Sequence, residues 1–222
     1  MKTVIFDLDG TLANTSGDLI ESANACFRHM GHGDVLNVAD DATTAMMGGG
    51  RAMLKAGFQR LGLPDDDDAI LPFYPMLLDA YEANIDVHTF LYPGCVAALD
   101  SLKASGHLLG VCTNKPERLA EILLTRLGIR EYFGALVGAD TLTVRKPDPA
   151  PLWASISRLG GKPERSVLIG DSPTDRNTAK SADVISILVT FGPDGQNVAS
   201  LQPEALLHHY DDLDNVMQTV LT

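Results

Sequence analysis

Two aspartates separated by one residue follow a short apolar run near the start of the chain. Val4-Ile5-Phe6 is rich in β-branched and aromatic side chains, which is typical of a strand buried on both faces. Asp7 and Asp9 come directly after this run, and Gly10 is suited to a turn. Asp and Gly are ordinary turn residues, so a surface turn would also explain the pattern. A reactive site becomes the better interpretation if other polar side chains meet these carboxylates.

Three further groups of polar residues follow predicted strands or lie in the loops just beyond them. They are Thr113 with Asn114, then Lys146, and then Asp171 with Asp175. In an open α/β sheet the carboxyl ends of the strands face one crevice, where ligands bind. We therefore expect all of these residues to meet at that edge.

Such a meeting would place like charges close together. At about 4 Å and an effective dielectric constant of roughly 20, each unpaired contact among Asp7, Asp9 and Asp171 costs about 4 kcal/mol. A cation would remove this cost, and the hard oxygen ligands, without His or Cys, favour Mg²⁺ over zinc. Lys146 adds a charge suited to a phosphate oxygen, and Thr113 adds a neutral donor. These groups together predict a phosphoryl-transfer site, where an aspartate can also act as a covalent nucleophile.

The elements that would position these residues alternate between strand and helix. After residue 92 the pattern predicts strands at 107–112, 135–137, 166–169 and 184–189, and helices at 93–105, 116–127, 148–159, 174–182 and 213–220. This alternation predicts an α/β fold with a doubly wound, mainly parallel sheet and helices on both faces.

One long segment departs from the alternation. Between residues 15 and 86 the pattern predicts only helices, at 18–30, 39–47, 51–61 and 67–83, separated by glycine-rich breaks at 48–50 and 62–64. We therefore predict two domains. Residues 1–14 and 87–222 form an α/β catalytic core, and residues 15–86 form an all-helical domain inserted after the first strand.

Composition narrows the class of partner. The formal net charge of −12 argues against nucleic acid or an anionic membrane as a partner, but a small anionic substrate is compatible with local donors and a metal. No apolar stretch approaches the roughly 20 residues that span a bilayer, and no signal peptide is recognisable. The three scattered cysteines, Cys26, Cys95 and Cys112, indicate no disulfide framework, so we expect a cytoplasmic protein. Monomer and homodimer both stay open.

Four motifs carry a resemblance to a known family. FDLDGTL (6–12), CTNKP (112–116), the lysine of RKPDP (145–149) and IGDSPTD (169–175) resemble, in the same order, the motifs of haloacid dehalogenase-like hydrolases. Residues 91–106, 134–140 and 190–192 are more similar to the phosphoglycolate phosphatase family. A lone DxD would be weak support, whereas four ordered motifs on the expected elements are strong. The resemblance covers nearly the whole chain and is loosest in the helical insertion and at the C-terminus.

The resemblance implies a Rossmann-like hydrolase core that hydrolyses a phosphorylated metabolite. Asp7 would attack phosphorus and form an aspartyl-phosphate, and Asp9 would serve as general acid and then general base. The Asp7 carboxylate, the Asp9 backbone carbonyl and Asp171 would bind Mg²⁺. The phosphoryl oxygens would be held by Thr113, Asn114 and Lys146. Asp175 would support the metal ligands or orient Lys146.

The helical insertion corresponds to the mobile cap of these enzymes, which would exclude water and select the substrate. Gly49 and Gly50 would let backbone amides approach a ligand, and Arg51 could bind a carboxylate bidentately. A flexible turn with a solvated arginine explains these residues equally well. Because 2-phosphoglycolate offers a second anionic group, it is the leading substrate.

Several rival functions stay open. A sugar-phosphate mutase, or another phosphatase or pyrophosphatase, would share the same core. Dehalogenase chemistry is disfavoured, because dehalogenases of this superfamily lack the second aspartate, Asp9. A non-catalytic phosphate-binding protein on this fold would be expected to have lost Asp7, Asp9, Lys146 or Asp171, and all four are present. The prediction is therefore an enzyme, a Mg²⁺-dependent phosphoric monoester hydrolase.

Overall fold

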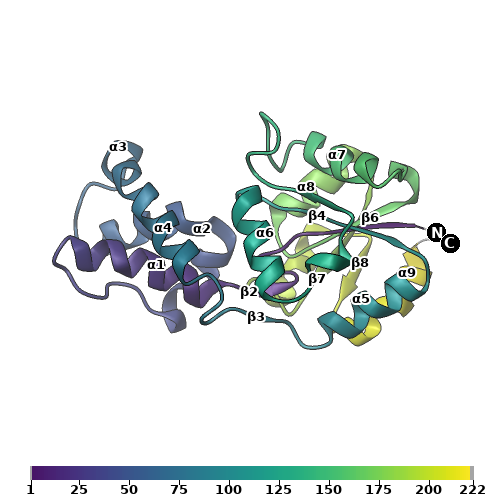
Figure 1. Cartoon of the computed structure of the whole chain (residues 1–222), viewed down its shortest axis with the longest axis horizontal. Coiled ribbons are helices and arrows are strands. Elements are labelled where there is room, and N and C mark those ends of the chain that lie inside the picture. The colour runs from purple at the N-terminus through teal and green to yellow at the C-terminus, as the bar shows by residue number, and fades with distance from the viewer. Residues whose placement is uncertain (1, 221–222) are drawn as a thin grey trace. The chain divides into compact units, whose positions relative to one another are not determined.

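The computed structural model describes residues 2–220, which divide into two compact units. The chain up to Ala13 and from Leu91 onward forms one unit, which we call the sheet unit, and Asn14–Phe90 forms the other, which we call the helical unit (Figure 1). These bounds differ slightly from the predicted boundaries after residues 14 and 86. The catalytic and cap roles of the two units stay predictions.

Asp18 explains why residues 87–90 go with the helical unit. Its carboxylate is fully buried and accepts hydrogen bonds from the backbone N–H groups of His88 and Thr89, each at 2.9 Å. The Thr89 hydroxyl donates a third, at 2.7 Å. This carboxylate therefore fastens the returning chain to the first helix of the unit.

The sheet unit is built on six parallel strands in the order β5-β4-β1-β6-β7-β8. The strands are β1 (Thr3–Phe6), β4 (Leu108–Cys112), β5 (Ala135–Val137), β6 (Ser166–Gly170), β7 (Ile185–Val189) and β8 (Ala205–Leu207). Strand β1 lies between β4 and β6, and its three apolar residues are fully buried, as expected for a strand covered on both faces. The predicted parallel α/β fold is confirmed.

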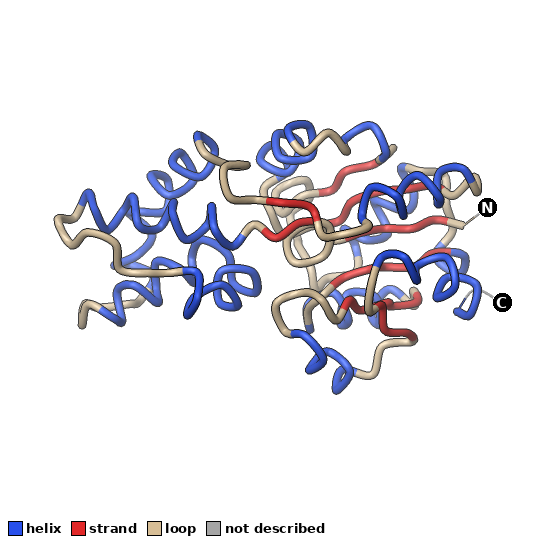
Figure 2. Tube along the Cα trace, turned by 90° about the horizontal axis from the view of Figure 1, so that it is seen from below, coloured by secondary structure: helices blue, strands red, loops and turns tan. Residues whose placement is uncertain are grey.

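Helices cover both faces of this sheet. They are α5 (Cys95–Ala104), α6 (Glu117–Arg126), α7 (Ala150–Arg158), α8 (Pro173–Ala182) and α9 (Leu213–Val220). Helices α7 and α8 pack side by side on one face, where Leu152, Ile156 and Ala179 meet Ile5 and Leu168 of the strands. Helices α5 and α9 pack together on the other face, and Figure 2 shows the strands running between the helices.

The helical unit contains α1 (Ser16–His29), α2 (Val38–Arg60), α3 (Asp67–Ile70) and α4 (Tyr74–Ala83). The chain passes from one unit to the other twice. The two connecting segments pair as a two-stranded sheet of β2 (Ala13–Asn14) and β3 (Phe90–Leu91). The break predicted at residues 48–50 is confirmed, because Gly49, with a φ of 62° and a ψ of −161°, separates two helical segments of α2. Short 3-10 segments occur at Leu71–Phe73, Arg130–Tyr132, Pro163–Arg165, Gly195–Leu201 and Tyr210–Asp212. No helix within residues 2–220 combines the length and apolar character needed to cross a bilayer.

An ion pair between a buried aspartate and a partly exposed arginine of the helical unit gives a stability prediction. Asp41 is buried near the start of α2 and accepts two 2.9 Å hydrogen bonds from Arg60 at the end of the same helix. It accepts a third from the N–H of Asn37, also at 2.9 Å. Burial opposes ionisation, but Arg60 and Asn37 outweigh it and lower the pKa of Asp41. We therefore expect Asp41→Asn to lower the free energy of unfolding by about 1–3 kcal/mol at pH 7.

The sign of the pH dependence follows from this lowered pKa. An unfolded aspartate has a pKa of about 3.9, so the ionised Asp41 contributes its full stability above that pH. The contribution is lost as the pH falls through the lower pKa of the folded state. Urea unfolding from pH 7 to pH 3 should show the two proteins converging at acidic pH. If the difference in unfolding free energy between wild type and Asp41→Asn stays the same at every pH, ionised Asp41 is not its source.

Candidate active site

The first carboxylate of the site is fixed by the end of β1. The N–H of Asp7 continues the ladder with β6 by donating to the carbonyl of Ile169 at 2.9 Å. The Asp7 Oδ1 atom accepts from the N–H of Leu8 at 2.7 Å, and the Leu8 carbonyl accepts from Leu12 and Ala13 in the following turn. A tight, well-bonded turn therefore holds Asp7 at the carboxyl edge of the sheet.

Lys146 lies between two carboxylates and is almost fully buried. Its Nζ atom is 2.6 Å from Asp175 Oδ1 and 3.1 Å from Asp7 Oδ1. Burial alone would lower the pKa of Lys146, but Asp175 and Asp7 hold it above its ordinary value. Lys146 therefore stays charged and brings a fixed ammonium group next to Asp7.

Asp175 holds this lysine from the first turn of α8. Its Oδ2 atom accepts from the Ser172 hydroxyl at 2.5 Å and from the N–H groups of Ser172 and Asp171 at 3.2 and 3.3 Å. The Ser172 hydroxyl accepts in turn from the N–H of Asp175, which completes a capping box at the start of the helix. Both carboxylate oxygens of Asp175 are thus engaged, which suits a residue that orients Lys146.

Asp171 follows the end of β6 and faces Asp7. The Thr11 hydroxyl donates to Asp171 Oδ1 at 2.9 Å, and both residues are buried. Within the described residues, carboxylate oxygens of Asp7, Asp171 and Asp175 lie within 4.8 Å of one another. The structure therefore gathers three predicted site residues from two motifs, FDLDGTL and IGDSPTD.

Burial and mutual repulsion disturb the titration of this cluster. Burial raises the pKa of Asp7 to about 7, with Asp175 and Asp9 adding to the rise and Lys146 opposing it. Burial, Asp175 and Asp7 raise the pKa of Asp171 well above its ordinary value. These shifts have a single cause, since four carboxylates share two ammonium groups in a place that water hardly reaches.

The motif after β4 supplies the remaining predicted residues. Thr113 is buried and its hydroxyl accepts from the N–H of Lys115 at 3.1 Å, which leaves its own hydrogen to donate elsewhere. Asn114 is exposed, and its Nδ2 atom donates to the carbonyl of Lys146 at 3.0 Å, which ties the two motifs together. The Lys115 Nζ atom lies 2.8 Å from Asp9 Oδ1.

Lys115 and Thr11 are site residues that sequence reasoning missed. Both lie inside quoted motifs, Thr11 in FDLDGTL and Lys115 in CTNKP, so the motifs themselves were the available signal. Thr11 bonds to Asp171, which lies 160 positions away, and Lys115 bonds to Asp9, which lies 106 positions away. No local sequence pattern shows contacts between such distant residues.

Gly49, Gly50 and Arg51 lie in the helical unit. Gly49 forms the kink in α2, and a Cβ atom on Gly50 would come within 2.5 Å of the Leu77 side chain. Arg51 is 40% exposed and pairs with Asp67 of α3 at 2.7 Å. Their predicted contact with substrate stays a prediction.

A divalent cation fits the residues that meet here. The ligand set would be the carboxylates of Asp7 and Asp171 and the backbone carbonyl of Asp9, all hard oxygens. The four carboxylates of the site outnumber its two ammonium groups by two, and like charges add to the rise that burial causes in the pKa of Asp7. Two positive charges would compensate this excess, which is what Mg²⁺ brings.

Gly10 gives a prediction about this ligand set. A Cβ atom on Gly10 would lie 2.4 Å from Asp171 Oδ2, so Gly10→Ala must displace that carboxylate. We expect the variant to bind Mg²⁺ about 10–100-fold more weakly in a calorimetric titration.

Gly31 provides the matched control. It has the same φ of +83° as Gly10, but a Cβ atom there would meet nothing within 4 Å. Gly31→Ala therefore carries a similar backbone strain of about 1–2 kcal/mol without disturbing any carboxylate. Equal metal affinity in the two variants would show that Asp171 is not a ligand.

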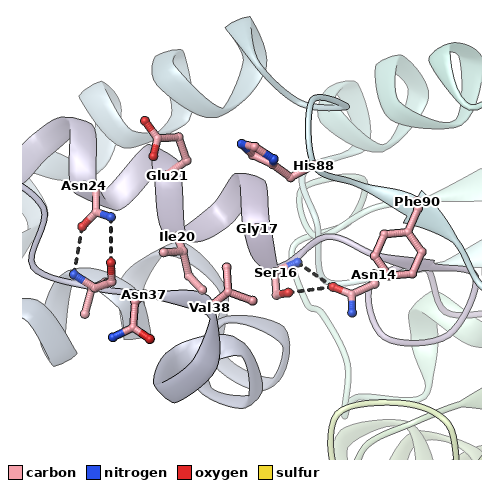
Figure 3. Close-up of a pocket in the computed structure, with 11 residues that line it drawn as sticks. Asn14, Ser16, Gly17, Ile20, Glu21, Asn24, Asn37, Val38, His88 and Phe90 are labelled. Atoms are coloured by element: carbon pink, nitrogen blue, oxygen red, sulfur yellow. Dashed lines mark hydrogen bonds between the residues drawn. The ribbon is translucent and has the colours of Figure 1, made fainter.

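A separate pocket of about 470 Å³ lies within the helical unit (Figure 3). None of the predicted site residues lines it. Asn14 Oδ1 already accepts from the N–H and hydroxyl of Ser16, and Asn24 is bonded to the backbone of Leu36. Glu21, on the wall of this pocket, is paired with Arg28 of α1.

The chain is similar to known hydrolases over almost its whole length. The family model described as haloacid dehalogenase-like hydrolase matches residues 4–189. The phosphoglycolate phosphatase of Agrobacterium fabrum is 38% identical over 208 residues, which cover 93% of this chain and 88% of that protein. The phosphoglycolate phosphatase of Rhodospirillum rubrum is 38% identical over 217 residues, which cover 96% and 89%.

Solved structures agree with the sequence comparisons. A crystal structure described as a predicted phosphoglycolate phosphatase from Haemophilus somnus has a TM-score of 0.85 and 27% identity, with 97% of each chain covered. One provisionally named beta-phosphoglucomutase, from Thermotoga maritima, has a TM-score of 0.74 and 25% identity, with 100% of each chain covered. The resemblance stated from the four motifs is confirmed, and the chain belongs to the haloacid dehalogenase-like hydrolases, as a hydrolase of phosphoric monoesters.

Proposed function

We propose that this chain is a Mg²⁺-dependent phosphatase of small phosphorylated metabolites and that 2-phosphoglycolate is its main substrate. One observation carries the reaction class. The Asp7 carboxylate lies at the carboxyl edge of the sheet, 3.1 Å from the buried ammonium group of Lys146 and beside Asp171. These positions support the proposal, because they would bring a nucleophile, a phosphate-binding cation and a carboxylate metal site to one place.

The chain's own residues account for both steps of hydrolysis. An oxygen of Asp7 attacks phosphorus, the bond from phosphorus to the ester oxygen breaks, and Asp9 donates a proton to the leaving alcohol. Asp9 then takes a proton from water, which attacks the aspartyl-phosphate and restores Asp7 with release of phosphate. A bound Mg²⁺ would offset negative charge on the phosphoryl group.

Lys146, Thr113 and Asn114 hold the phosphoryl oxygens during these steps. Lys146 brings a buried charge, which is worth more in this environment than in water. Thr113 donates its hydroxyl hydrogen, and Asn114 donates from its amide while steadying the loop that carries Lys146. Asp175 keeps Lys146 in place.

The substrate assignment rests on the names of the relatives and on the second anionic group of 2-phosphoglycolate, which a cation of the protein could bind. Both sequence relatives described above are named phosphoglycolate phosphatase.

We assign residues 1–14 and 87–222 as the catalytic core and residues 15–86 as the cap, where Gly49, Gly50 and Arg51 would contact substrate. The free, buried thiols of Cys26, Cys95 and Cys112 support a reducing cytoplasm.

A phosphate-release screen over a panel of phosphorylated metabolites tests this proposal. With Mg²⁺, 2-phosphoglycolate should give the highest kcat/KM, and a chelator should abolish release from every compound. If another metabolite leads the panel, the substrate assignment is wrong although the reaction class stands. If no compound releases phosphate, the phosphatase assignment is wrong.

A sugar-phosphate mutase is the second candidate, because the Thermotoga maritima structure carries that name. The same panel separates the two functions. A mutase would convert an aldose phosphate into its isomer without net release of phosphate, and product analysis by NMR would detect the isomer.

A further inference from the structure

Lys115 is a second buried cation of the site, and the two hydrolytic steps do not use it. Its side chain is 5% exposed and its Nζ atom lies 2.8 Å from Asp9 Oδ1. The backbone on both sides is fixed, since its N–H donates to the Thr113 hydroxyl at 3.1 Å and its carbonyl accepts from Ala139 at 2.9 Å. The ammonium group is therefore held at a defined position next to Asp9.

This position has a consequence for what can bind near the leaving group. As general acid, Asp9 must come within about 2.6–3.2 Å of the ester oxygen. Lys115 lies one hydrogen bond beyond Asp9, so a substituent next to the ester oxygen would come close to its ammonium group. An ammonium group has three N–H donors, and binding Asp9 does not exclude a second anionic acceptor.

We propose that Lys115 determines specificity by binding a carboxylate that the substrate carries one carbon from its ester oxygen. The proposal rests on the proposed function and names the substrate class as phosphate esters of 2-hydroxy acids. Lys146, the other cation of the site, has different partners from Lys115. It is held by Asp7 and Asp175 and serves the phosphoryl group. Arg51, which the sequence suggests as a second group for a carboxylate, lies in the helical unit and pairs with Asp67.

The test compares two substrates that differ only in this carboxylate. In ethyl phosphate a methyl group replaces the carboxylate of 2-phosphoglycolate. Because both substrates need Asp9, any effect of Lys115 on Asp9 cancels in the ratio of their kcat/KM values. Lys115→Met should lower the ratio about 10–100-fold, through a higher KM for 2-phosphoglycolate.

Two control variants accompany this measurement. Lys115→Arg keeps the charge and should retain most of the preference for 2-phosphoglycolate. Lys162→Met makes the same substitution at an exposed position of the sheet unit and should leave the ratio at the wild-type value. An unchanged ratio in Lys115→Met would overturn the proposal and leave the phosphatase assignment intact.

A binding measurement makes the proposal testable without turnover. The phosphonate 3-phosphonopropionate keeps the carboxylate, and propylphosphonate lacks it. Calorimetry in the presence of Mg²⁺ should show that wild type prefers 3-phosphonopropionate by about 10–100-fold and that Lys115→Met loses this preference. Equal affinity of the wild-type protein for the two compounds would refute a carboxylate site at Lys115.

Discussion

Replacing Asp7 by Asn should lower Mg²⁺-dependent release of p-nitrophenol from p-nitrophenyl phosphate by about 10⁴-fold or more. The amide is a far weaker nucleophile than the carboxylate, and it removes one of the charges that would bind the cation. The amide has nearly the same size, so the hydrogen bond from the N–H of Leu8 has an acceptor in the variant.

Loss of folding would not explain such a result. Burial raises the pKa of Asp7, which means that the folded protein pays to keep this carboxylate ionised. The Asn variant should therefore unfold at a temperature no lower than that of the wild type. Asp68→Asn, at an exposed position of α3, is the matched control and should keep full activity. Near-wild-type turnover by the Asp7 variant would contradict the assigned nucleophile.

Replacing Lys146 by Met should damage stability and activity together. The substitution leaves Asp7 and Asp175 buried without the ammonium group that lies within 3.1 Å of both. Breaking a buried pair in this way costs about 3–5 kcal/mol, which urea unfolding would measure. Activity should fall by at least about 10²-fold, because a charge that binds the transferring phosphoryl group is lost.

A double variant separates pairing from other effects of this substitution. Lys146→Met with Asp175→Asn no longer buries the Asp175 charge unpaired, so its loss of stability should be smaller than the sum of the two single losses. Lys162→Met should change the unfolding free energy by less than about 0.5 kcal/mol. Additive losses in the double variant would show that the two side chains act independently.

The strands and the family could be predicted because their signals are local. The apolar runs before Asp7, Thr113 and Asp171 are β1, β4 and β6, and each ends where a polar motif begins. Since parallel strands place their carboxyl ends on one edge, the meeting of Asp7, Lys146 and Asp171 followed from the alternation alone. The structure brings these residues together, and their chemical roles stay predictions.

Other features could not be predicted because they depend on distant contacts. Strand β8 (Ala205–Leu207) has three residues and follows a 3-10 segment, so only its pairing with β7 defines it. The contact of Arg60 with Asp41 joins residues 19 positions apart, on either side of the kink at Gly49, and no local pattern shows it. The pairing of Lys115 with Asp9 joins two motifs, and neither motif reveals the other's position.

Formation of an aspartyl-phosphate on Asp7 during phosphatase turnover can be tested by direct chemical detection. The enzyme is mixed with Mg²⁺ and ³²P-labelled 2-phosphoglycolate, quenched in acid within milliseconds, and mapped by proteolysis and mass spectrometry. We expect a hydroxylamine-labile phosphoryl group on the peptide that contains Asp7, and none in Asp7→Asn. A wild-type protein that turns over substrate with no covalent label, or with a label on another residue, would contradict the role of Asp7 as nucleophile.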